Sequence, residues 1–321
     1  MTKIDLITGI LGAGKTTFLR EYAQYLIRQG KRIAILENDF GAVNVDMMML
    51  QDLKSEHCQL EMISGGCDPH CHRRRFRTQL IALGMQHFDR VLVEPSGIFD
   101  MDEFFDILYD EPLGRWFEIG SILTVIDGET PETLPPHMEY LLASEAAYSG
   151  KLVLSKAGEK PGETASRILN HLNRALEYVK CRRRFSEADI LVKAWENFTD
   201  DDFAGFSSAG WQHADYVKLF RTEEMQSTVR YFMHIRLPEN RIADILRGIF
   251  DDPACGQLYR LKGSLPAESG WVKVNITAKQ TEIAPVPEGQ SVLIAIGDTV
   301  NRAEIDRRLQ AYNTDPEYVS V

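Results

Sequence analysis

The sequence predicts an α/β protein, with a mostly parallel sheet in its first part and a smaller α+β domain in its second part. Between residues 3 and 156, short apolar runs alternate with segments of helical periodicity, a pattern typical of a parallel sheet covered by helices. After about residue 185 this alternation stops, and the later apolar runs favour mostly antiparallel strands. A chain of 321 residues is long enough for both domains.

The first domain is expected over residues 1–195. A strand at 3–8 precedes a helix at 15–30, which ends at Gly30. Four further strands and two further helices follow, with strands at 31–38, 90–95, 121–127 and 151–156 and helices near 73–87 and 136–149. Because these strands are apolar throughout, we expect helices on both faces of the sheet.

The second domain is expected over residues 226–321, after a polar and weakly periodic connector at 196–225. Its predicted elements are strands within 228–237, 257–265, 270–285 and 291–297, and helices near 239–250 and 301–312. The sequence contains no internal repeat that would suggest a solenoid.

Composition restricts the class of partner and the compartment. A net charge of −11 argues against general binding to nucleic acid or to anionic membranes, since phosphate groups would be repelled on average. The apolar runs are far too short to cross a bilayer, and the N-terminus does not read as a signal peptide. Five cysteines, an odd number, fit a reduced protein better than a disulfide scaffold, so we expect a cytoplasmic location.

A glycine-rich turn, TGILGAGKTTF at residues 8–18, lies between the first predicted strand and the first predicted helix. Its Gly-x-x-x-x-Gly-Lys-Thr pattern matches a P-loop in the required strand–turn–helix context. Such a turn points backbone N–H groups at phosphate oxygens, and the helix N-terminus adds positive character. We therefore predict a nucleotide site formed by Gly9, Gly12, Ala13, Gly14, Lys15, Thr16 and Thr17.

Within this site, Lys15 is expected to neutralise the β- and γ-phosphates, and the Thr16 hydroxyl is expected to ligate Mg²⁺. Glu94 ends an apolar strand in VEPSG and is predicted to hold the metal through water, while the N–H of Gly97 would meet the γ-phosphate. Glu37 and Asp39 end the second strand, where they either approach a metal or form a turn.

Taken together, GILGAGKTTFL, ENDFGAVNVD, GGC…C, VEPSG, VID, RLKG and IAIGD resemble the CobW family of P-loop GTPases, relatives of the UreG and HypB type. The resemblance extends over nearly the whole chain. It implies GTP binding and hydrolysis coupled to holding or handing over a transition metal. It also implies a client metalloprotein and a homodimer as possible partners.

Four candidate metal ligands lie close together at Cys67, His70, Cys71 and His72. The family has Cys-x-Cys-Cys here, so the second thiol is displaced and two imidazoles join it. Thiolate and imidazole are preferred ligands of Zn²⁺ and also suit Co²⁺ or Ni²⁺. We predict a partly open site, completed by Glu37, Asp39, water or a partner. The alternative is a buried cysteine pair with exposed histidines near a turn.

The segment that would read the base departs from the usual Asn-Lys-x-Asp of guanine-binding proteins, since Ser155-Lys156-Ala157-Gly158 stands there. Lys156 is still expected to pack across the base, but the aspartate position holds Gly158. Glu159 would substitute if the loop shifts by one residue. GTP is favoured by the resemblance, although losing the carboxylate should relax discrimination against ATP.

The leading hypothesis is therefore a GTP-hydrolysing metallochaperone or metal-insertion factor with a low basal rate. Two alternatives remain: a small-molecule kinase that uses ATP, and a nucleotide-dependent scaffold without significant catalysis.

Overall fold

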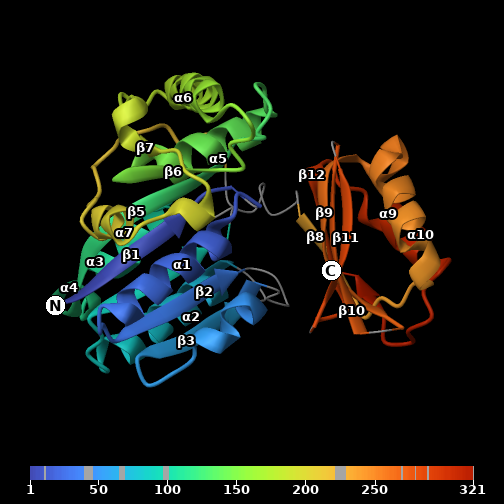
Figure 1. Ribbon diagram of the computed structural model, residues 1–321, viewed down its shortest axis with the longest axis horizontal. Coiled ribbons are helices and arrows are strands. Elements are labelled where there is room, and N and C mark those ends of the chain that lie inside the picture. Colours follow the sequence, from blue (N-terminus) through green and yellow to red (C-terminus); the bar gives the residue numbers. More distant parts are fainter. Residues whose placement is uncertain are drawn as a thin grey trace. The chain divides into compact units, whose positions relative to one another are not determined.

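The computed structural model describes residues 1–10, 12–39, 46–64, 69–96, 101–220, 229–268, 270–278, 280–287 and 289–320. The described chain forms two compact units, one from residues 1–39 and 49–220 and the other from residues 229–320 (Figure 1). No helix among the described residues is both long enough and apolar enough to cross a bilayer.

The first unit contains a seven-stranded sheet in the order β3-β2-β4-β1-β5-β6-β7, and every neighbouring pair is parallel. This confirms the predicted parallel sheet. The strands are β1 (Thr2–Thr8), β2 (Ile33–Asp39), β3 (Cys58–Ser64), β4 (Arg90–Pro95), β5 (Phe117–Asp127), β6 (Lys151–Ser155) and β7 (Ile190–Leu191). β3 and β7, at the two edges, were not predicted from the sequence.

Helices follow the strands along the chain, as the alternation predicted (Figure 1). They are α1 (Lys15–Arg28), α2 (Pro69–Gly84), α3 (Met101–Tyr109), α4 (Leu113–Trp116), α5 (Pro136–Ala147), α6 (Pro161–Tyr178) and α7 (Asp200–Ser207), with 3₁₀ turns η1 (Asp46–Leu53), η2 (Glu187–Asp189) and η3 (Trp195–Asn197). Successive side chains of β2 and β4 are buried on both faces of the sheet, which explains their unbroken apolar runs.

Residues 196–220, predicted as part of a connector, instead belong to the first unit. The aromatic side chains of this segment pack against α1: the Phe206 ring lies 5.1 Å from the ring of Phe18, measured between centroids, and Phe203 stacks on Tyr25. Thr199 caps α7 by accepting a hydrogen bond from the N–H of Asp202. The three phenylalanine rings that reach α1, those of Phe198, Phe203 and Phe206, therefore anchor a segment whose average composition is that of a loop.

The second unit is a six-stranded antiparallel sheet in the order β11-β10-β9-β12-β8-β13. α9 and α10 pack on one face, where Leu246, Ile249, Ile305 and Leu309 join the core. This is the α+β domain that the sequence predicted. Its elements are β8 (Val229–Met233), η4 (Glu239–Arg241), α9 (Ile242–Asp251), η5 (Pro253–Cys255), β9 (Gln257–Ala267), β10 (Gly270–Thr277), β11 (Thr281–Val286), β12 (Val292–Asp298), α10 (Arg302–Gln310) and β13 (Val319–Ser320).

A buried ion pair lies in the first unit, away from the carboxyl ends of the strands. The Asp5 side chain is fully buried and accepts hydrogen bonds from Arg90 Nη1, the Tyr22 hydroxyl at 2.8 Å and the Ser121 N–H at 2.7 Å. Burial raises the pKa of Asp5, and the charge of Arg90 opposes that rise. Arg90 also donates to the Ser207 carbonyl at 3.1 Å, which ties the end of α7 to the sheet.

Candidate functional site

The glycine-rich turn leads from β1 into α1, as the sequence predicted. Gly9 has φ of +133°, and a Cβ there would lie 2.2 Å from the carbonyl oxygen of Val125. Gly14 caps α1 at φ of +99°, a conformation that side chains rarely tolerate. Both positions favour glycine, and at Gly9 the backbone lies closer to β5 than a residue with a Cβ would allow. Gly12 and Ala13 lie between them, and Thr17 follows in the first turn of α1.

Lys15 and Thr16 begin α1 and are buried, with 5% and 6% of their surface exposed. The Thr16 hydroxyl donates to Glu94 Oε1 at 2.9 Å, and Lys15 Nζ lies 4.0 Å from the same oxygen. The structure therefore brings together three of the residues that the sequence assigned to phosphate and Mg²⁺, although Glu94 lies 78 positions after Thr16 in the chain.

Glu37 approaches the same place from the neighbouring strand. β2 pairs with β4 so that Glu37 lies directly opposite Glu94, and both carboxylates are buried. In a parallel pair, opposite residues point to the same face of the sheet, and that face is the one that α1 covers. Two carboxylates side by side are unfavourable in a protein interior unless positive charge balances them. Thr16, Glu37 and Glu94 are thus a donor set that fits Mg²⁺, with Lys15 beside it.

The end of β6 braces the glycine turn from the other side. Ser155 Oγ donates to the Ala13 carbonyl at 2.6 Å, and Lys156 Nζ donates to the Gly12 carbonyl at 3.2 Å. Lys156 also forms an ion pair with Asp127 at the end of β5. Lys156 adopts φ of +48° to do so. The loop that the sequence assigned to the base is therefore in direct contact with the loop assigned to phosphate.

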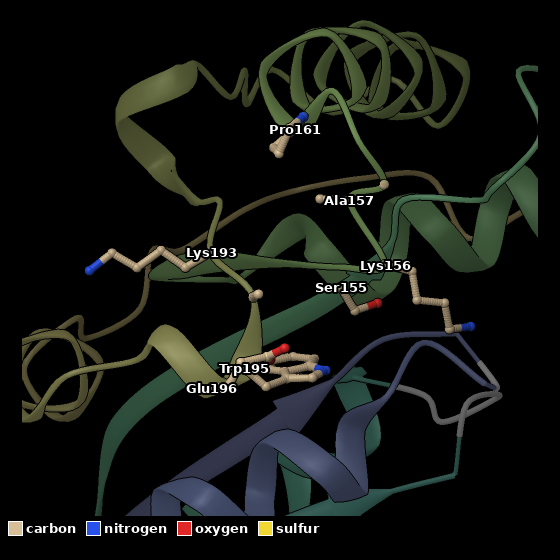
Figure 2. A pocket seen from close by; sticks show the side chains of 9 residues that line it. Ser155, Lys156, Ala157, Pro161, Lys193, Trp195 and Glu196 are labelled. Carbon is tan, nitrogen blue, oxygen red and sulfur yellow. The ribbon is translucent and has the colours of Figure 1, made fainter.

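A cavity of about 340 Å³ opens beside this contact (Figure 2). It is lined by Ser155, Lys156, Ala157, Gly158, Pro161, Lys193, Ala194, Trp195 and Glu196. Figure 2 shows the Trp195 indole on one side and Pro161 on the other, with Lys156 extending toward the glycine turn. Trp195 comes within 3.5 Å of the Cβ position of Gly14. Trp195, a wall of the cavity, thus lies next to the N-cap of α1, so the cavity adjoins the glycine turn.

Sequence reasoning missed Glu145, which lies under the glycine turn. Its side chain is fully buried in α5, and Oε2 accepts a hydrogen bond from the N–H of Gly9 at 3.1 Å. The Thr8 hydroxyl donates to the Glu145 carbonyl at 2.8 Å. The available signal was a single charged residue within the otherwise mostly apolar run 140–148.

The predicted metal cluster is only partly visible. Cys67 and Gly97 lie outside the described residues, as do the side chains of Asp39 and His70. Cys71 and His72 both lie in the first turn of α2, which begins at Pro69. Cys71 is partly exposed, whereas His72 is 1% exposed. Consecutive helical residues point about 100° apart, so these two side chains do not converge in this conformation.

Among the described residues, no group of three or more His, Cys, Asp and Glu side chains is arranged to hold a metal ion. A metal site built from residues 67–72 would therefore need ligands from outside the described residues, or a different conformation at the start of α2.

The cysteines should differ in reactivity. Burial raises the pKa of Cys58 to about 12, and Cys58 is 1% exposed, so its thiolate is scarce and inaccessible at neutral pH. Cys181 and Cys255 are also buried. Treating the folded protein with iodoacetamide should modify Cys71 well before these three, as read by peptide mass spectrometry. In urea the four should react at similar rates. Labelling of Cys58 as fast as Cys71 in the folded protein would contradict this assignment.

Comparison with known proteins places the chain in a family. The E. coli zinc chaperone YjiA is 27% identical over 177 residues, 51% of this chain and 54% of YjiA. The E. coli zinc chaperone YeiR is 31% identical over 128 residues, 40% of this chain and 38% of YeiR. The chain therefore spans about half the length of YjiA and less of YeiR. The solved structure of Zn(II)-bound YjiA GTPase from E. coli aligns over 98% of this chain and 99% of that chain, with 17% identity and a TM-score of 0.39.

Residues 3–185 match the family described as the CobW/HypB/UreG nucleotide-binding domain. This stretch includes the glycine turn, Glu37, the 67–72 segment, Glu94 and the Ser155–Lys156 loop. Because the match covers more than half of the chain, this protein belongs to the CobW/HypB/UreG family.

Proposed function

We propose that this protein binds GTP and Mg²⁺ at the glycine turn, hydrolyses GTP slowly, and uses the nucleotide state to hold or release a transition metal carried by residues 67–72. The observation that carries the proposal is the junction of Thr16, Lys15 and Glu94 at the start of α1, with Glu37 opposite Glu94. A buried ammonium and a hydroxyl next to two strand-end carboxylates suit a triphosphate and its metal.

In this proposal Thr16 and the Glu94 carboxylate, with Glu37 nearby, would hold Mg²⁺, and Mg²⁺ would supply positive charge to the phosphate oxygens. The backbone N–H groups of the turn bind phosphate oxygens, and Lys15 balances the charge that develops on them. Glu94 would also orient the attacking water, and the N–H of Gly97 would meet the γ-phosphate. None of the residues assigned to the phosphates is an arginine or a glutamine, so we expect slow basal hydrolysis that metal, dimerisation or a client accelerates.

The transition metal is the cargo, and zinc is the first candidate because the curated relatives YjiA and YeiR are named zinc chaperones. The topology supports coupling between cargo and nucleotide. β3 pairs with β2 along the strand that carries Glu37, and β3 ends at Ser64, just before the segment that contains Cys67. A shift at the carboxyl end of β2 that follows nucleotide binding therefore has a short route to the metal ligands.

The experiment is elemental analysis of protein purified without chelator, combined with GTP turnover. Wild type should carry zinc in a ratio that changes when GTP is added, and Cys67→Ala should lower both the zinc content and the response of turnover to zinc. Cys58→Ala is the matched control, because this buried thiol in the same unit should leave both unchanged. If Cys67→Ala alters neither quantity, the proposed coupling is wrong.

The partners and the location are proposed from the family and from the composition. We propose a client metalloprotein as the recipient of the metal, a homodimer as the assembly, and the cytoplasm as the compartment. Light scattering of the purified protein with and without GTP tests the assembly directly.

A further inference from the structure

The cavity beside the glycine turn has lost the carboxylate that normally reads guanine, since Gly158 occupies that position. Guanine presents two adjacent donors on one edge, N1–H and the 2-amino group. A single carboxylate accepts both, whereas adenine offers a donor next to an acceptor. A site that distinguishes the two bases therefore needs a carboxylate from another element.

Of the hydroxyl and charged side chains that line the cavity, all but one are engaged elsewhere. Ser155 donates to the Ala13 carbonyl, and Lys156 is held by Gly12 and Asp127. Lys193 donates to both oxygens of Asp202, at 2.8 and 2.6 Å. Glu196 is the exception: it is exposed and forms no hydrogen bond or ion pair among the described residues. It is also the single carboxylate among the lining residues.

The backbone that carries Glu196 is fixed on both sides. Trp195 packs against Phe18 and Phe198, with ring centroids 6.0 and 5.3 Å apart, and this anchors the η3 turn to α1. After the turn, Asp202 accepts hydrogen bonds from Thr199 and from Lys193, which closes the segment into a loop. The backbone of Glu196 is therefore held in place, so binding a base would have to order only the exposed Glu196 side chain.

We infer that Glu196 is the residue that selects guanine in this protein, by accepting hydrogen bonds from N1–H and the 2-amino group in place of the missing aspartate. The inference rests on the proposed function, in that it takes the cavity to be the base site. Lys156 then covers one face of the base with its aliphatic stem, and Glu196 approaches the base edge from the loop after β7. The specificity contact has moved from the loop after β6 to the neighbouring loop.

The sequence offered Glu159 as the substitute, and the structure argues against it. Glu159 lines a different cavity, together with Glu132, Lys160, Glu163, Thr164 and Arg167, and does not line the cavity of Trp195 and Glu196. Glu196 and Glu159 therefore provide a matched pair of variants. Both are glutamates that line neighbouring cavities, and only Glu196 is predicted to contact the base.

The test is a calorimetric titration of the full chain with MgGDP, MgADP and MgXDP, the xanthine nucleotide, which avoids turnover. Xanthine has a carbonyl where guanine has its amino group, so a carboxamide complements it and a carboxylate repels it. Glu196→Gln should weaken GDP binding about 10- to 100-fold and strengthen XDP binding by about 10-fold. Glu159→Gln should leave both unchanged.

The outcomes separate this inference from the proposed function. If wild type binds GDP well and Glu196→Gln keeps the wild-type order of affinities, the role of Glu196 is wrong while the nucleotide site stands. Equal weakening of all three nucleotides by Glu196→Gln also overturns the inference, because it indicates a structural role. If wild type binds no guanine nucleotide, or prefers ADP, both proposals fall. A reversal of the GDP and XDP preference supports the inference.

Discussion

Replacing Lys15 with alanine is expected to lower GTP turnover by about 10²- to 10³-fold, the usual loss when one preorganised charge on a developing oxyanion is removed. Lys15 Nζ lies 4.0 Å from Glu94 Oε1 in a buried setting, beside a second strand-end carboxylate at Glu37. Without the ammonium, the start of α1 presents mainly negative side chains to a triphosphate. The loss should therefore appear in nucleotide affinity as well as in the rate.

Single-turnover hydrolysis of GTP under saturating enzyme measures the rate, and calorimetry with MgGDP measures the affinity. Lys31→Ala is the control, since Lys31 lies exposed just beyond the end of the same helix. A melting curve of the variant confirms that it is folded. Turnover within about threefold of wild type in folded Lys15→Ala protein would remove the glycine turn from the proposed site.

The nucleotide-facing side of the fold was predictable because it follows from local spacing and from a general property of parallel sheets. The P-loop pattern fixes glycines, lysine and threonine within eight residues, and the carboxyl ends of parallel strands meet at one edge. Those two rules were enough to expect Glu94 near Thr16, and the structure places them 2.9 Å apart. The order of the seven strands in the sheet could not be predicted from local spacing, because it depends on pairing between strands that lie far apart in the sequence.

The missed elements lacked a local signal. β3 lies at the edge of the sheet, so Gln59 and Glu61 are tolerated within it and interrupt the apolar pattern. β7 is two residues long. The segment 196–220 has the composition of a loop, but its order comes from rings that contact Phe18 in α1, 180 positions away in the chain for Phe198 and 188 for Phe206. Window-based reasoning does not detect such pairings.

The side chains of the candidate site also divide into those that a sequence motif predicts and those that only the fold brings to the site. Lys156 was predicted because it holds the lysine position of the Asn-Lys-x-Asp pattern after an apolar strand, whereas Glu145 and Glu196 carry no motif and become visible only when α5 and the η3 turn are placed. The Cys/His segment illustrates the reverse problem. Its residue types suggest one metal site, but Pro69 starts a helix, and helical geometry turns Cys71 and His72 in different directions.

Arg90→Met is expected to lower the free energy of unfolding of the first unit by about 3–5 kcal/mol, the cost typical of removing one partner from a buried ion pair. Asp5 is fully buried, and Arg90 is its cationic partner. Methionine keeps most of the arginine stem in place, so packing changes little and the loss reports mainly the uncompensated carboxylate. The hydrogen bond from Arg90 to the Ser207 carbonyl, which secures α7, is lost as well.

Urea unfolding followed by tryptophan fluorescence measures this loss, because Trp116, Trp195 and Trp211 lie in the first unit. Arg74→Met is the matched control, since Arg74 is exposed and should change the unfolding free energy by less than about 0.5 kcal/mol. Asp5→Asn combined with Arg90→Met should recover most of the loss, because the asparagine oxygen can still accept from the Ser121 N–H, its amide nitrogen can donate to the Tyr22 oxygen that Arg90 leaves, and no charge is buried.

The pH dependence of this stability loss is a second, independent test of the role of the Asp5 charge. Burial raises the pKa of Asp5 in the folded protein despite the opposing charge of Arg90, so the folded state binds this proton more tightly than the unfolded chain does. When the folded-state pKa of a carboxyl lies above its unfolded-state pKa, the free energy of unfolding falls as pH rises from the unfolded-state pKa through the folded-state pKa. Removing Arg90 takes away the opposing charge and moves that window upward. The deficit of Arg90→Met relative to wild type should therefore grow as pH rises above the folded-state pKa of Asp5 in wild type, and the double variant should show no such growth. A deficit that stays constant over the whole pH series would mean that Arg90 stabilises the unit through packing and its contact with α7, and not through the charge of Asp5.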